Sequence, residues 1–176
     1  MPKRLLAAVL GLSFVLAFTP NARSGLGGQE GFAPPPQIPY GPPITIDGAR
    51  RAAAAAASIA QANGWTMAIA VVDTGGHLVL FEKMDGTQTG SVDVAIDKAR
   101  SAALFRRPTK VFEDGVAAGG QGVRLLALRG AVPLEGGEPL ILNDQVIGGI
   151  GISGGSGAQD GVVARAGAEA LQSEGR

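Results

Sequence analysis

The chain has 176 residues, with 15 basic and 15 acidic side chains and no cysteine. This length fits one domain, and the lack of cysteine excludes disulfides and thiolate metal sites. The charge balance argues against a nucleic-acid partner. Scarce aromatic residues and abundant Ala and Gly predict thin side chains and close approach of backbones. Such a core gains less from burial, which favours association of subunits as a further source of stability.

Residues 1–24 have the three-part pattern of a secretory signal peptide. Lys3 and Arg4 precede a charge-free apolar run over residues 5–18, and small residues lead to a cleavage site after Ser24 or Ala22. As a helix the apolar run spans about 21 Å, short of the roughly 30 Å hydrocarbon core, so no stable membrane anchor is expected. Three of the 15 basic residues leave with this leader, which gives the mature chain a net charge of −3. We therefore expect an exported protein, periplasmic or extracellular.

Residues 25–43 are dominated by Gly and Pro and are interpreted as a linker. The folded domain is expected over residues 44–176. Asp47 is predicted to cap a helix over residues 48–62, which the following Asn-Gly pair ends because both residues tolerate the left-handed conformation.

A β-hairpin is predicted next, because the apolar run over residues 65–73 and the strand-length segment 77–82 are joined by a tight Gly turn. A second helix is expected from Ser91 to the Arg-Pro pair that ends at Pro108, since the residue before proline disfavours the α region. Its predicted apolar stripe consists of Val92, Ile96, Ala99 and Ala103.

The stretch over residues 109–128 turns polar, then Gly-rich, then briefly apolar, and receives no assigned element. A second hairpin is predicted from strands 140–142 and 145–153, joined by Asn143-Asp144, and a last helix over 159–171. The order helix, hairpin, helix, hairpin, helix indicates an α+β fold. We expect a single domain with a central antiparallel β-sheet and flanking α-helices.

Two glycine motifs overlap in this second hairpin. The first, GxGxxG from Gly149 to Gly154, lies inside a strand and lacks a following parallel strand, so it is interpreted as close packing across a sheet rather than dinucleotide binding. The second, GxSxG around Ser153, would need a downstream histidine to form a hydrolase triad. The only histidine, His77, lies upstream.

His77 is compatible with a metal or haem ligand, a general base, or an exposed turn residue. With no second histidine, a multi-histidine zinc site within one chain is excluded. Asp73 and Asp85 flank the first hairpin as solvated charges or as acid–base groups. Arg106 and Arg107 form a cationic element at a helix end, which either complements the helix dipole or holds a carboxylate or propionate.

Four segments together resemble a known family. They read AVVDTGGHLVLFEKMDG (70–86), DKARSAALFRRPT (97–109), PLEGGEPLIL (133–142) and QVIGGIGISGG (145–155), and the resemblance extends in order over about residues 44–171. The family is the GlcG/HbpS-type haem-binding family, related to the C-terminal domain of PduO-type proteins. The resemblance implies a compact α/β domain with a central antiparallel sheet, assembled into homo-oligomers, with haem binding in some exported members.

Carried over to this sequence, Thr109 matches the ligand region of the family, and Arg106 and Arg107 become candidates for the haem propionates. His77 is chemically the better iron ligand. The expected function is an exported, homo-oligomeric protein that binds haem or a related tetrapyrrole and is not a catalyst. Two alternatives stay open. One is an enzyme or accessory factor acting on a small carboxylated metabolite, with His77, Asp73 or Asp85 as acid and base, and the other is a structural oligomer without a ligand.

Overall fold

The computed structural model describes residues 38–172, so the predicted leader and most of the predicted linker lie outside the described residues. The elements in chain order are α1 (Ile46–Ala62), β1 (Ala68–Asp73), β2 (Leu78–Lys83), α2 (Ser91–Phe105), α3 (Lys110–Ala117), the 3-10 helix η1 (Gly120–Ala127), β3 (Gly137–Leu142), β4 (Gln145–Ser153) and α4 (Gly157–Gln172).

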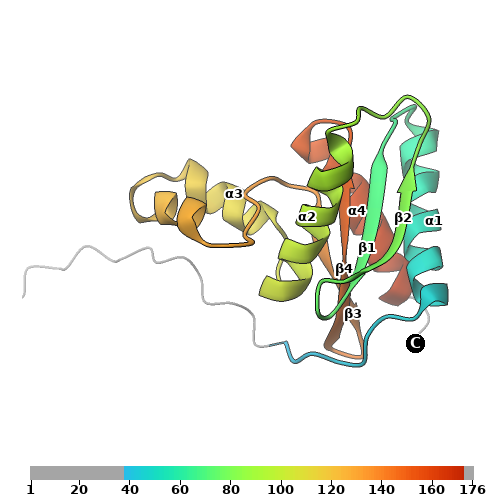
Figure 1. The fold of residues 1–176 in the computed structure, drawn as a ribbon, viewed down its shortest axis with the longest axis horizontal. Coiled ribbons are helices and arrows are strands. Elements are labelled where there is room, and N and C mark those ends of the chain that lie inside the picture. The colour runs from blue at the N-terminus through green and yellow to red at the C-terminus, as the bar shows by residue number, and fades with distance from the viewer. Residues whose placement is uncertain (1–37, 173–176) are drawn as a thin grey trace, which may run out of the picture. The chain divides into compact units, whose positions relative to one another are not determined.

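The four strands form one sheet in the order β2-β1-β4-β3, and each neighbouring pair is antiparallel. Helix α2 covers one face of the sheet, whereas α1 and α4 cover the other (Figure 1). Strand β1 lies inside the sheet and is buried on both faces, which explains its continuous apolar sequence. The predicted α+β fold with a central antiparallel sheet is therefore confirmed.

Helix α2 packs unusually close to β4 because neither partner carries bulk. A Cβ atom added to Gly151 would lie 2.1 Å from the carbonyl oxygen of Ala95, and one added to Gly149 would lie 2.4 Å from that of Ala99. The glycines of the GxGxxG motif therefore serve close packing, as predicted. The predicted stripe of α2 is partly wrong, because Val92 and Ile96 are only half-buried. The helix faces the sheet with the smaller side chains Ala95, Ala99, Ala102 and Ala103.

The opposite face of the sheet holds the larger core cluster. Its bulk comes from branched residues of β1 and β4, against which α1 presents a row of buried alanines. The row consists of Ala49, Ala52, Ala53, Ala56 and Ala60. At the start of α1 the prediction fails, because the cap is Thr45, whose Oγ1 accepts a 3.1 Å hydrogen bond from the Gly48 nitrogen. Asp47 instead pairs with Arg50 at the surface.

The chain already contacts the sheet before Ile44, within the stretch predicted as linker. The Gly41 nitrogen donates to the Val146 carbonyl oxygen at 2.9 Å, and the Val146 nitrogen donates to that of Pro39, also at 2.9 Å. These two bonds fasten residues 38–43 beside the beginning of β4, where Tyr40 and Val146 form an isolated parallel bridge.

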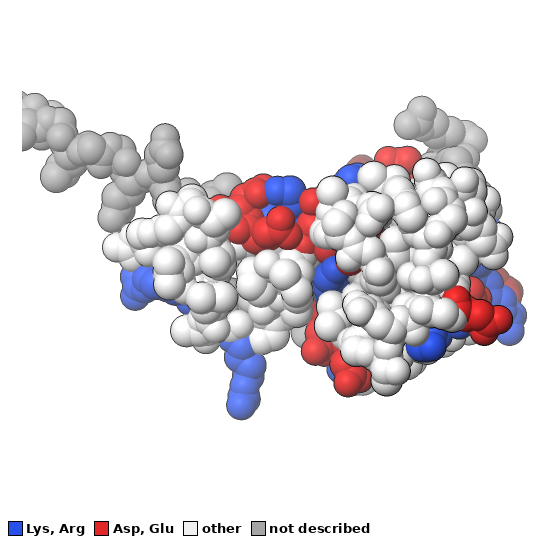
Figure 2. All heavy atoms as spheres, turned by 90° about the horizontal axis from the view of Figure 1, so that it is seen from above, with Lys and Arg blue, Asp and Glu red and all other residues white. Residues whose placement is uncertain are grey.

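Helix α3 and η1 were not predicted, and they lie to one side of the sheet (Figure 1). The segment buries little: Phe112 is the one buried residue of α3, where its ring meets that of Phe105 edge-on at 5.2 Å, and none is buried in η1. Large apolar side chains from η1 and the loop after it are 42–63% exposed, namely Val123, Leu126, Leu128 and Leu134. In Figure 2 this part of the surface is mostly uncharged.

Candidate functional site

The turn between β1 and β2 holds the imidazole of His77 in a fixed orientation. The Asp73 carboxylate oxygen Oδ1 accepts hydrogen bonds from the backbone nitrogens of Gly75 (2.8 Å) and His77 (2.9 Å). The other oxygen, Oδ2, lies 3.2 Å from His77 Nδ1. A Cβ on Gly75 would lie 2.8 Å from His77 Cε1, so a larger residue here would displace the exposed ring from this position. The turn thus depends on Asp73, and Gly75 leaves space for the ring.

The ring is presented to solvent with its second nitrogen outward. The His77 side chain is 83% exposed, and its Nδ1 faces Asp73, which leaves Nε2 as the nitrogen that a ligand or iron would meet. Partial burial raises the pKa of Asp73, but hydrogen bonds from His77 and Gly75 and the charge of the imidazole outweigh it and hold this pKa below its ordinary value. A carboxylate on the far nitrogen is the usual second partner of a metal-binding histidine.

The C-terminal half of α2 lies directly behind this turn. The Arg100 Nε donates to the Gly76 carbonyl oxygen at 3.1 Å, and a Cβ on Gly76 would lie 3.5 Å from both Arg100 and Leu104. Leu78 and Leu104 are 46% and 45% exposed. Imidazole, guanidinium and exposed leucine side chains thus occur together at this end of the sheet.

The two predicted arginines at the end of α2 point to different places. Arg106 adopts the left-handed conformation (φ 54°), donates to the Ile38 carbonyl oxygen at 2.8 Å and lies over the Tyr40 ring at 5.2 Å. Arg107 is only 4% exposed, and its guanidinium lies 5.7 Å from the centre of the Phe112 ring. Of these two arginines, only Arg106 therefore lines an accessible pocket.

Thr109 is fully buried and fastens the start of β3. Its hydroxyl donates to the Leu134 carbonyl oxygen at 2.6 Å and accepts from the Gly137 nitrogen at 2.9 Å, while its own nitrogen donates to the Gly137 carbonyl oxygen. The single hydroxyl proton is thus engaged within the protein. Asp85 is exposed in the turn after β2, whereas His77 precedes that strand, so the fold does not bring these two predicted groups together.

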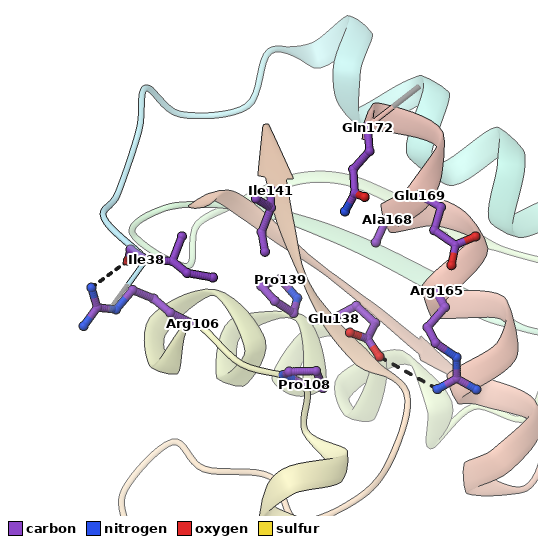
Figure 3. Close-up of a pocket in the computed structure, with 10 residues that line it drawn as sticks. All are labelled: Ile38, Arg106, Pro108, Glu138, Pro139, Ile141, Arg165, Ala168, Glu169 and Gln172. Atoms are coloured by element: carbon purple, nitrogen blue, oxygen red, sulfur yellow. Dashed lines mark hydrogen bonds and ion pairs between the residues drawn. The ribbon is translucent and has the colours of Figure 1, made fainter. Parts of the chain in front are cut away.

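A separate hollow of about 280 Å³, which the sequence did not predict, lies beside the edge strand β3. Figure 3 shows it between β3, α4 and the link from α2 to α3. Its polar residues are Arg106, Glu138, Arg165, Glu169 and Gln172, and its apolar ones are Ile38, Pro108, Pro139, Ile141 and Ala168. Because β3 and α4 are separate in sequence and no motif joins them, no sequence signal pointed to this hollow.

Glu138, one of the acids that line this hollow, has a raised pKa. Burial raises its pKa, the charge of Arg165 lowers it, and the charges of Glu135 and Glu169 raise it, with a result of about 7 instead of 4.5. Arg165 Nη1 lies 3.9 Å from Glu138 Oε1 but only 3.0 Å from Glu135 Oε1. The arginine is thus committed mainly to Glu135, which leaves Glu138 weakly compensated.

Two negative findings bound the chemistry of residues 38–172. Among the described residues, no three His, Asp or Glu side chains lie close enough together to hold a metal ion. Among the described helices, none is both long and apolar enough to cross a membrane.

Comparison with known proteins gives consistent matches. A family model described as "Haem degrading protein HbpS-like" matches residues 44–169. Protein GlcG of Escherichia coli K12 is 42% identical over 94 residues, which are 53% of this chain and 69% of GlcG. The crystal structure of a double mutant of HbpS from Streptomyces reticuli superimposes with a TM-score of 0.68 and 32% identity, and the match covers 79% of this chain and 94% of HbpS. A PduOC:heme complex gives a TM-score of 0.66 and 27% identity, over 73% of this chain and 95% of that one.

Proposed function

This chain belongs to the HbpS-like family, and on that basis we propose that it binds haem or a related tetrapyrrole. The observation that carries the proposal is the family match over residues 44–169, together with the similarity to a structure solved with haem. Bound haem would supply an iron that takes one or two side-chain donors, and two propionates that need cations.

The turn before β2 fits these requirements best. His77 has an exposed imidazole whose Nδ1 is held by Asp73, so Nε2 is oriented for iron. Arg100 from the C-terminal half of α2 would serve as a cation for a propionate, and Leu104 offers apolar surface for the ring. Arg106 instead lines the hollow beside β3. By contrast, Thr109 would have to give up its bond to Leu134 before it could bind iron, and Arg107 is buried.

Haemin titration of the purified protein is expected to show saturable binding with a defined Soret band. His77→Ala should weaken binding at least tenfold or shift that band, because it removes the only imidazole of the chain. Gln61→Ala, an exposed change in α1, is the matched control and should titrate like wild type. If Thr109→Val alters the spectrum while His77→Ala does not, the iron ligand is assigned wrongly. Absence of saturable binding to wild type would refute the proposed function.

An alternative function rests on the same turn. The contact between His77 Nδ1 and Asp73 Oδ2 is the arrangement that a general base needs, with the carboxylate orienting the ring. An enzyme or accessory factor that acts on a small carboxylated metabolite would use this pair. Asp85 would not take part in this acid–base pair, because it follows β2 whereas His77 precedes it.

We also propose that the protein is a homo-oligomer. The support is the row of 42–63% exposed apolar side chains on η1 and the following loop, which a second copy would cover. Light scattering should therefore give a mass of at least two chains. Leu126→Glu should shift the distribution toward the mass of one chain, whereas Gln61→Glu, on the exposed surface of α1, should not. A wild type with the mass of one chain at micromolar concentration would contradict the proposal.

Export is proposed from the leader pattern in residues 1–24 alone. N-terminal sequencing of extracytoplasmic material should find a mature chain that starts near Gly25. An intact Met1 in that material would contradict cleavage.

A further inference from the structure

The hollow beside β3 is lined by Glu138, a buried carboxyl group that is only weakly compensated. Three carboxylates interact here, because Glu135 and Glu169 both act on Glu138, and the cation that faces them is Arg165. The second cation of the hollow, Arg106, is turned away toward the Ile38 carbonyl oxygen, as Figure 3 shows. Around Glu138 the carboxylates therefore outnumber the cations that face them.

Glu138 is 8% exposed, and its one ion-pair contact among the described residues is the long 3.9 Å approach to Arg165. Desolvation of a carboxylate costs several kcal/mol unless donors replace the lost water. A side chain in this state gains most from a ligand that brings a charged hydrogen-bond donor.

The shape and lining of the hollow limit the class of ligand. A metal ion is disfavoured, because the described acids do not gather as a metal site requires. The remaining walls are apolar, with Pro139 and Ile141 on β3 and Ala168 on α4. A volume of about 280 Å³ is near the lower end of the range of small-molecule pockets, so a short amine fits within it.

We propose that this hollow binds a small primary amine, whose ammonium group pairs with Glu138 beside Glu169 and whose short apolar body packs on Pro139, Ile141 and Ala168. The inference goes beyond the proposed haem function and does not depend on it, because it uses none of the residues assigned to haem iron. The bound ammonium would reduce the excess of negative charge that Arg165 leaves uncompensated.

Calorimetric titration with n-butylamine tests the proposal, with n-butanol and butyrate as uncharged and anionic counterparts of the same length. Butylamine should bind saturably, and the other two should bind at least tenfold more weakly. Since an ammonium pairs with the ionised carboxylate, binding near pH 6.5 should release protons, seen as a dependence of the heat on the ionisation enthalpy of the buffer.

Glu138→Gln should weaken butylamine binding at least tenfold, and Glu169→Gln, at the rim of the hollow, should weaken it a few-fold. Glu82→Gln, an exposed change on the opposite edge strand β2, should have no effect. Circular dichroism establishes that each variant is folded. The proposal is overturned if wild type shows no saturable butylamine binding, if butyrate binds as well as the amine, or if Glu138→Gln binds the amine like wild type.

Discussion

Lys98→Ala is expected to lower the free energy of unfolding by about 3–5 kcal/mol, because it leaves a buried carboxylate without its counter-charge. Lys98 on α2 donates to Asp160 Oδ2 on α4 at 2.7 Å and to the Ile152 carbonyl oxygen on β4 at 3.0 Å. Both side chains of the pair are at most 4% exposed. One ammonium thus joins two helices and a strand, and Asp160 also accepts from the Gly155 nitrogen before α4.

Chemical denaturation at pH 7.5 measures the loss, and Lys83→Ala at the exposed end of β2 serves as the control, within about 0.5 kcal/mol of wild type. Burial already raises the pKa of Asp160 in spite of Lys98. Without the lysine that pKa rises further, so the deficit of Lys98→Ala should shrink as the pH is lowered and the carboxyl becomes protonated. Adding Asp160→Asn should restore part of the stability at pH 7.5, because no charge is then buried. A variant as stable as wild type would show that the ion pair contributes nothing.

The hairpins and three of the helices were predictable because their signals are local. Asn143 and Asp144 form a two-residue turn in which both φ angles are positive, 51° and 57°, and these residue types tolerate that conformation. Gly64 ends α1 for the same reason, with φ 68°, after the C-cap Asn63 at φ −100°. Each of these boundaries is set by residues adjacent in the sequence, so the local sequence is enough to locate it.

Helix α3 and η1 escaped prediction because they lack the pattern that marks a packed helix. A helix is recognised by apolar residues at a helical spacing, but only Phe112 is buried in α3 and none in η1. The Pro108-Thr109 pair immediately before α3 was a usable start signal, because proline and threonine are both common at helix N-termini. The apolar residues of η1 face outward, which sequence patterns cannot distinguish from a core.

The candidate site was predictable only where its partners are close in sequence. Asp73 and His77 are four residues apart in one turn, and both were identified. Glu138 and Arg165 meet through the packing of α4 beside β3, and Lys98 and Asp160 are 62 residues apart. Such pairs depend on how elements pack, so no spacing rule finds them. Thr109 was identified by resemblance, and its full burial and two hydroxyl hydrogen bonds emerge only from the fold.

Glu138→Gln is expected to stabilise the protein at pH 8 and to leave its stability at pH 4 nearly unchanged. The folded pKa of Glu138, about 7, lies above its ordinary value of 4.5. Between these two values the folded state binds more protons than the unfolded state, so this carboxyl makes stability fall as pH rises from about 4.5 to about 7. The loss is complete above pH 7, because both states are then ionised.

A tenfold change in proton affinity corresponds to about 1.4 kcal/mol, so the full effect is roughly 3 kcal/mol. Glutamine keeps the shape of the side chain and cannot ionise, so the gain of Glu138→Gln over wild type should grow to roughly that size between pH 4.5 and pH 7 and then level off. Denaturation midpoints at half-unit pH steps measure this curve, and Glu82→Gln on the exposed edge strand β2 should follow wild type throughout. A gain that is equal at pH 4 and pH 8 would instead indicate better packing by glutamine. No gain at pH 8 would mean that the contact with Arg165 fully offsets the cost of burying Glu138.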